Sequence, residues 1–214
     1  MVRAILTDAM DVLFHGLTDL AKIAKAIDKD KSTNEEFYLR YVDCHLEDFW
    51  ELCRGNISEI DFCKQRNDAA RDLSSLARKC LLRALRINMR RRIKGTFEIY
   101  QELMAKYDVQ LFLASDHIAE FVPQLIEWHP EVFDAIPRLK RFWSCDIGFV
   151  KRDPEFFPYV FSIMENNFGI PKDDVLVVDD NGTTIDLLRA QGVNAVHYER
   201  ERFVKDLERY GLVA

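Results

Sequence analysis

Two short apolar runs that each end in aspartate place the strongest limit on the fold of this chain. The first begins at Ala4 and leads to Asp8, and the second covers residues 175–178 and leads to Asp179 and Asp180. Runs of this length predict buried parallel strands. Because open α/β sheets bind ligands at the carboxyl ends of their strands, we expect these aspartates at the functional edge.

From about residue 95 onward, strand and helix patterns alternate. The predicted elements are a helix over 96–106, a strand over 109–114, helices over 117–128, 154–168 and 184–191, and a last strand over 194–197. Alternation of this kind is typical of parallel sheets with right-handed crossovers. The sequence therefore predicts an α/β fold with a Rossmann-like, three-layer parallel sheet core.

Residues 16–92 contain no convincing strand, and their apolar side chains recur at helical spacing. Gly55 interrupts this pattern, and Ser58 followed by Asp61 predicts an N-cap that begins another helix. The apolar positions are Leu17, Leu20, Ile23, Ala24, Ile27, Phe37, Tyr38, Tyr41, Val42, Phe49, Trp50 and Cys53. We predict a helical cap over 16–92, inserted into a core formed by 1–15 and 93–214.

The composition favours a small-molecule ligand. A net charge of -6 and a pI near 5.5 give no support for binding to nucleic acid or to an anionic membrane. No apolar run reaches the ~18 residues of a membrane span. The five cysteines form no CxxC pair, which favours free thiols and a cytoplasmic location.

Polar groups with complementary chemistry follow the strand and loop signals in order. They are Asp8, then Ser115 and Asp116, then Lys151, and finally the pair Asp179 and Asp180. Carboxylates can hold Mg²⁺, while a lysine and a hydroxyl can orient a transferring phosphoryl group. A carboxylate that is not used by the metal can attack phosphorus.

This order resembles the haloacid dehalogenase-like (HAD) hydrolase superfamily over nearly the whole chain. Asp8 matches the family nucleophile, residues 113–116 look like the second motif, residues 148–157 the third, and residues 177–181 the fourth. Residues 49–63 are similar to the small helical cap of the subgroup that holds sugar-phosphate phosphatases and the N-terminal domain of soluble epoxide hydrolase. The resemblance implies a Mg²⁺-dependent phosphatase acting on a small phosphorylated substrate.

The resemblance also implies a role for each matching residue. Asp8, Ser115 and Lys151 would be catalytic, and Ser115, Asp116 and Lys151 would bind the substrate. The metal ligands would be Asp8, the backbone carbonyl of Met10, Asp180 and Asp179, with Asp179 alternatively orienting Lys151.

Met10 departs from the family pattern, in which an aspartate two positions after the nucleophile protonates the leaving group. A thioether has no proton to donate, so acid-base catalysis worth about 10²- to 10⁴-fold is expected to be missing. Asp11 could substitute as the acid. However, successive side chains of an extended segment point to opposite sides, so Asp11 is expected to face away from the position of Met10.

Met10 leaves three hypotheses open. The first is a phosphatase with impaired acid-base catalysis, which would hydrolyse acyl and aryl phosphates better than sugar phosphates. The second is a catalytically silent domain that binds a phosphorylated ligand or a protein, and the third is a metal-independent 2-haloacid dehalogenase.

Further residues near these motifs are secondary candidates. His117, beside the second motif, could contact a substrate, although capping a helix or facing solvent is the commoner role and is what we expect. Phe49, Trp50, Phe142 and Trp143 could line a substrate pocket, although packing between cap and core is the commoner role of such residues.

Overall fold

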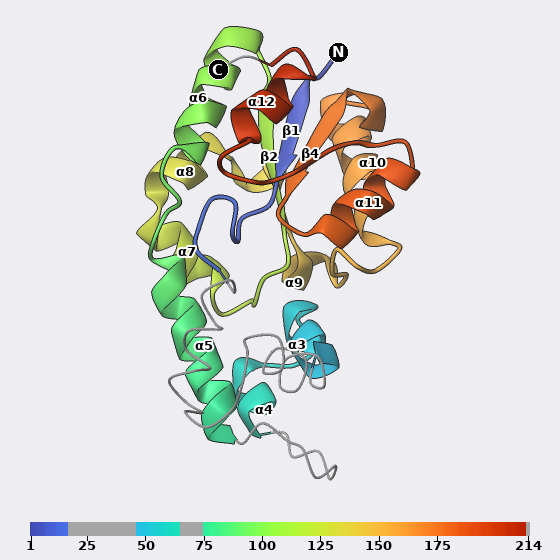
Figure 1. Cartoon of the computed structure of the whole chain (residues 1–214). Helices are drawn as coiled ribbons and strands as arrows, with labels where there is room; N and C mark the ends of the chain where they lie inside the picture. Colours follow the sequence, from blue (N-terminus) through green and yellow to red (C-terminus); the bar gives the residue numbers. More distant parts are fainter. Residues whose placement is uncertain (17–45, 65–74, 213–214) are drawn as a thin grey trace.

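The structure is a computed structural model that describes residues 1–16, 46–64 and 75–212. Its centre is a five-stranded parallel sheet with the order β3-β2-β1-β4-β5 (Figure 1). The strands are β1 (Ala4–Thr7), β2 (Gln110–Ser115), β3 (Arg141–Trp143), β4 (Val175–Asp179) and β5 (Asn194–His197). Because β1 pairs with both β2 and β4, the strand that leads to Asp8 lies in the middle of the sheet.

Helices cover both faces of this sheet, which confirms the predicted three-layer α/β fold (Figure 1). One face carries α6 (Thr96–Tyr107), α7 (Val122–Trp128), α8 (Pro130–Ala135) and α12 (Phe203–Glu208). The other face carries α10 (Phe156–Phe168) and α11 (Gly182–Ala190). Shorter elements are α9 (Ser144–Ile147) and the 3₁₀ helices Arg138–Lys140 and Lys172–Asp174.

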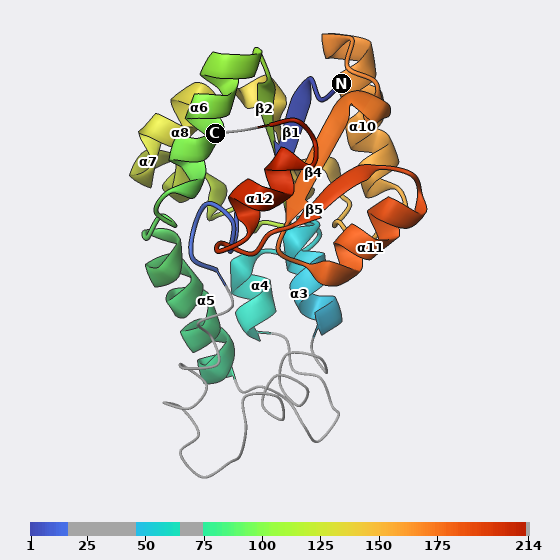
Figure 2. The same cartoon turned by 45° about the horizontal axis from the view of Figure 1, so that its top comes forward.

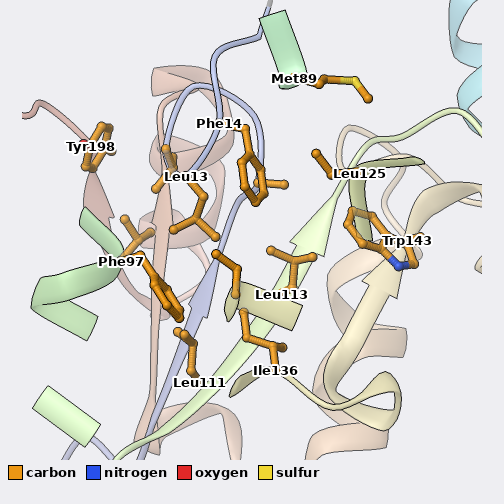
Figure 3. Packing of buried hydrophobic residues seen from close by; sticks show 14 of the residues in the cluster. Leu13, Phe14, Met89, Phe97, Leu111, Leu113, Leu125, Ile136, Trp143 and Tyr198 are labelled. Atoms are coloured by element: carbon orange, nitrogen blue, oxygen red, sulfur yellow. The ribbon is translucent and has the colours of Figure 1, made fainter. Parts of the chain in front are cut away.

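Two hydrophobic clusters fill the space between the layers. Ile5 belongs to one cluster, and its neighbours Ala4 and Leu6 belong to the other, because successive side chains of a strand point to opposite faces. Figure 3 shows Leu111 and Leu113 of β2 in the first cluster, together with residues from the surrounding helices. A strand that is buried on both faces needs the continuous apolar runs seen in the sequence.

Three further helices lie beyond the carboxyl ends of the strands (Figures 1 and 2). They are α3 (Leu46–Cys53), α4 (Glu59–Lys64) and α5 (Ser75–Met89). The Ser58 hydroxyl accepts a hydrogen bond from the Asp61 backbone N–H at 3.1 Å, which confirms the predicted N-cap of α4. Ser144 Oγ, just after β3, donates to the Cys53 carbonyl at 2.7 Å and so joins α3 to this edge of the sheet.

The predicted division into a core and a cap over 16–92 stays a prediction. The helical pattern from Leu17 to Val42 lies outside the described residues. In the part of the chain that the structure describes, all five strands come from the two segments assigned to the core. No helix in this part is long and apolar enough to cross a membrane.

Most predicted boundaries agree with the structure to within about two residues, but helix α7 begins at Val122 instead of His117. Pro123 lies in its first turn, where the missing N–H costs nothing, and the preceding residues form a loop. The sequence pattern also missed β3, α8 and α12. Each has only three to six residues, too few to show a period.

Candidate active site

Asp8 and the pair Asp179–Asp180 meet at the carboxyl edge of the two central strands. Thr7 lies opposite Val178 in the β1–β4 register, and the Asp8 backbone N–H donates to the Val178 carbonyl at 2.8 Å. One carboxylate oxygen from each of the three aspartates lies within 4.8 Å of the other two. Strand pairing therefore brings together residues that are far apart in the sequence.

Lys151 connects two of these carboxylates. Its Nζ lies 2.9 Å from Asp8 Oδ2 and 2.6 Å from Asp179 Oδ2, and its side chain is buried. Burial by itself lowers the pKa of Lys151, but the charges of Asp179 and Asp8 outweigh it and raise the pKa above its ordinary value. Lys151 is therefore a permanent cation beside Asp8.

The loop that carries Lys151 is fixed by two further aspartates. Asp116 Oδ1, just after β2, accepts a hydrogen bond from the Lys151 backbone N–H at 2.8 Å. Asp153 Oδ2 accepts one from the Val150 backbone N–H at 2.9 Å. Because the backbone is held on both sides, the Lys151 side chain has a defined direction toward Asp8.

The carboxylates are crowded, and their pKa values rise. Burial raises the pKa of Asp8 to about 6, with Lys151 lowering it and Asp179 raising it further. Burial, and then the charges of Asp8 and Asp179, raise the pKa of Asp180 to about 8. Burial raises the pKa of Asp116 to about 7. The site holds more negative charge than Lys151 can neutralise.

Ser115 is fully buried at the end of β2, beside Asp116. Its Oγ has no hydrogen-bond partner among the described residues, although buried hydroxyls are normally bonded. Among the described residues, Asp116 is part of the lining of the cavity at this edge of the sheet, whereas Ser115 is not. The predicted contact of Ser115 with a phosphoryl oxygen stays a prediction.

The chain turns sharply after Asp8, so the expectation that Asp11 faces away from the site is wrong. Residues 8–14 are not extended: the Leu13 and Phe14 backbone N–H groups both donate to the Ala9 carbonyl at 2.9 Å. Asp11 has a left-handed φ of 57°, and its Oδ1 accepts a hydrogen bond from the Gly16 N–H at 2.9 Å. Both Met10 and Asp11 line the cavity that contains Asp8.

This cavity has a volume of about 710 Å³, which suits a small organic ligand. Among the described residues, five aspartates line it, against the two permanent cations Lys151 and Arg152. Its apolar lining residues are Met10, Phe49, Trp50, Cys53, Leu85, Met89, Ile118, Phe121 and Leu187. Of the four predicted pocket aromatics, Phe49 and Trp50 line the cavity, whereas Phe142 and Trp143 are buried in the clusters that flank the sheet.

His117 is buried and lines the cavity, so the expected capping or solvent position is wrong. Its ring lies 5.3 Å from the Trp143 ring and 6.4 Å from the Phe121 ring, measured between centroids. Burial lowers the pKa of His117 to about 4, so the imidazole is neutral at neutral pH.

The fold is similar to that of several solved structures described as HAD enzymes. HAD-hydrolase YfnB from Bacillus subtilis, bound to magnesium, has a TM-score of 0.63 and 17% identity, covering 97% of this chain and 99% of that one. A HAD family enzyme from Bacteroides thetaiotaomicron, in complex with magnesium and inorganic phosphate, has a TM-score of 0.56 and 13% identity, covering 93% of this chain and 95% of that one. The chain has the HAD-like fold. A protein described as a dehalogenase also matches, with a TM-score of 0.59 and 14% identity over 94% and 86% of the chains.

The sequence itself matches no protein-family profile and no curated protein. The likeness therefore lies in the fold. The strand order is HAD-like, and backbone pairing at the sheet edge brings Asp8, Asp179 and Asp180 together. Neither feature indicates which substrate the protein binds.

The acidic cluster of this HAD-like chain fits a divalent cation. Hard cations prefer carboxylate and carbonyl oxygens, and the three clustered aspartates supply oxygens close enough to share one ion. Burial is the main cause of the raised pKa values of Asp8 and Asp180, and the neighbouring carboxylates raise both further. The role of the Met10 carbonyl as a further ligand stays a prediction.

Proposed function

We propose that the protein is a Mg²⁺-dependent hydrolase of the HAD type that removes a phosphoryl group from a small organic phosphate. The observation that carries the proposal is the bridge formed by Lys151 between Asp8 and Asp179, with Asp180 beside it. This arrangement supplies a nucleophile, a fixed cation and a set of metal ligands within one cavity. The magnesium and phosphate complexes of similar folds support it.

In the proposed reaction, an Asp8 carboxylate oxygen attacks phosphorus. A new O–P bond forms, the bond from phosphorus to the leaving-group oxygen breaks, and its electron pair stays on that oxygen. Lys151 holds the phosphoryl oxygens, and Ser115 donates its unpaired O–H to one of them. Bound Mg²⁺ would supply further charge neutralisation through Asp8, Asp179 and Asp180.

Water then attacks phosphorus of the aspartyl phosphate. The bond to the Asp8 oxygen breaks, both protons of the water remain on the product as dihydrogen phosphate, and the Asp8 carboxylate is restored. Because Met10 cannot protonate an alkoxide, leaving groups that depart as stable anions are favoured, namely carboxylates and phenolates.

A second function is favoured by the same methionine. A chain with the metal and phosphate contacts but without the acid could bind a phosphorylated ligand and release it unchanged. Phosphate-dependent thermal stabilisation of a protein that turns over no organic phosphate would support this reading.

The deciding experiment is hydrolysis of p-nitrophenyl phosphate with Mg²⁺ and with EDTA, for the native protein and for Asp8→Asn. We expect activity that is lost in EDTA and in Asp8→Asn. Inactivity of the native protein under all conditions contradicts the phosphatase and leaves the binding function. Halide release from a 2-haloacid in EDTA would instead identify a dehalogenase.

A further inference from the structure

The cavity has two sides of unlike chemistry. Its acidic side lies at the sheet edge and continues from Asp180 to Asn181 and Thr183 at the start of α11. Its apolar side comes from α3, α5 and the segment after β2. The residues of the apolar side used below are Phe49, Trp50, Leu85, Met89 and Phe121.

Neighbouring contacts hold the apolar side in place. The Phe49 and Trp50 rings meet edge to face with centroids 5.6 Å apart. Leu85, Met89 and Phe121 are buried members of the first hydrophobic cluster. Side chains packed in this way have little freedom to change rotamer, so this side offers a fixed and mainly apolar surface.

We propose that this surface selects a phosphate ester or anhydride with an apolar organic part, an aryl phosphate or an acyl phosphate with a hydrocarbon chain. The proposal rests on the proposed phosphatase function and names its substrate class. A sugar phosphate would place several hydroxyls against Phe49, Leu85 and Phe121. Each buried hydroxyl without a partner weakens binding, whereas an apolar group gains by leaving water.

Among the described residues, a small set of polar groups borders this side: Trp50 Nε1, His117 Nε2 and the guanidinium of Arg152, whose Cζ lies 5.6 Å from the centroid of the Trp50 ring. Trp50 Nε1 and His117 Nε2 are buried, and neither has a partner among the described residues. Both residues line the cavity. An apolar organic part needs no hydrogen bond on this side, whereas each hydroxyl of a polyol would need a partner from this small set.

Met10 leads to the same substrate class from a separate observation. Without an acid at that position, the leaving oxygen must depart unprotonated. Phenolates and carboxylates do so more readily than sugar alkoxides. The apolar side affects how tightly the organic part of the substrate binds. Met10 affects a different step, the cleavage of the bond between phosphorus and the leaving oxygen.

The test measures equilibrium binding of non-hydrolysable phosphonates to the native protein in Mg²⁺. n-Butylphosphonate and 3,4-dihydroxybutylphosphonate form a matched pair that differs by two hydroxyls, and phenylphosphonate and inorganic phosphate complete the set. We expect the butyl and phenyl compounds to bind at least about tenfold more tightly than the dihydroxy compound. Equal binding, or a preference for the dihydroxy compound, overturns the inference.

Two variants of helix α5 locate the preference. Leu85 lines the cavity, whereas Ile87 on the same helix is 55% exposed. Leu85→Gln should reduce the butyl preference to below about threefold and leave inorganic phosphate binding unchanged, while Ile87→Gln should change neither. If Leu85→Gln does not fold, Phe49→Gln replaces it, since Phe49 is only half-buried. An unchanged preference in the folded variant overturns the assignment of this side.

The outcomes separate the inference from the proposed function. Binding of inorganic phosphate together with p-nitrophenyl phosphate turnover, but without an apolar preference, overturns the inference and leaves the phosphatase. Absence of binding for all four ligands overturns both. Comparing the kcat/KM values of phenyl phosphate and hexanoyl phosphate then distinguishes the aryl from the acyl substrate, and a high value for either supports the inference.

Discussion

Arg54 at the end of α3 forms a two-pronged ion pair with Asp153, two residues after Lys151. Arg54 Nε lies 2.9 Å from Asp153 Oδ2, and Arg54 Nη2 lies 2.7 Å from Asp153 Oδ1. The same Asp153 Oδ2 accepts the Val150 N–H. One carboxylate therefore joins the helix beside the cavity to the loop that positions the lysine.

We predict that Arg54→Lys weakens this connection, because an ammonium cannot make the two parallel bonds. Loss of one charge-assisted bond should cost about 1–3 kcal/mol of stability and reduce kcat/KM for an aryl phosphate about tenfold. Thermal unfolding and steady-state kinetics measure these effects. Arg202→Lys is the control, since its pair with Glu199 is exposed; equal effects of the two variants contradict the prediction.

A second prediction concerns the missing acid. Met10→Asp should raise turnover of an alkyl phosphate by about 10²- to 10⁴-fold, because a carboxylic acid can protonate the leaving alkoxide. Turnover of an acyl phosphate should change little. Met10→Asn introduces a side chain of the same size as aspartate but without the acid, so this variant should leave alkyl phosphates unhydrolysed. A gain shared by both variants would mean that Met10 acts through its bulk.

A third prediction concerns Asp11. Asn can adopt a left-handed φ and can accept the Gly16 N–H, so Asp11→Asn should keep the native melting temperature. Asp11→Ala loses that hydrogen bond and should be destabilised by about 1–2 kcal/mol. If Asp11→Asn folds normally but loses activity on aryl phosphates, the carboxylate of Asp11 takes part in the reaction.

The fourth prediction is a pH dependence of magnesium binding. Without metal, burial raises the pKa of Asp8 to about 6 and that of Asp180 to about 8. The folded state therefore binds these protons more tightly than the unfolded state, so metal-free stability falls as the pH rises from about 4 through 8. Mg²⁺ competes with the same protons, and its affinity should rise over this range.

The measurement is the shift in melting temperature caused by Mg²⁺ at pH 5 and at pH 8.5. The shift should be several times larger at the higher pH, and calorimetry in two buffers should detect protons released on binding. Asp180→Asn should remove most of the difference. A shift that is independent of pH in the native protein contradicts a metal site at these carboxylates.

The sequence predicted the parts of the fold that depend on local pattern. Continuous apolar runs marked β1, β2, β4 and β5, and the residues that follow them assemble at one edge because parallel strands all end there. The sequence pattern did not indicate strand β3, because its only apolar residues are Phe142 and Trp143.

The cavity lining could not be predicted in the same way. Leu85 and Phe121 have no sequence signal that separates them from ordinary core residues, since their place in the cavity depends on how distant helices pack. Asp11 was misplaced for a different reason. The alternation rule applies to extended backbone, and the positive φ of Asp11 breaks it.

The central position of β1 also bears on how the protein is made. During synthesis this strand emerges first, yet its two partners are Gln110–Ser115 and Val175–Asp179. Contacts between residues so distant in the chain form slowly, and unpaired strand edges favour aggregation until they close. A nascent chain that has not yet reached Asp180 therefore lacks the acidic cluster altogether. Magnesium-dependent protection from proteolysis would mark the moment at which translation has delivered β4 beside β1.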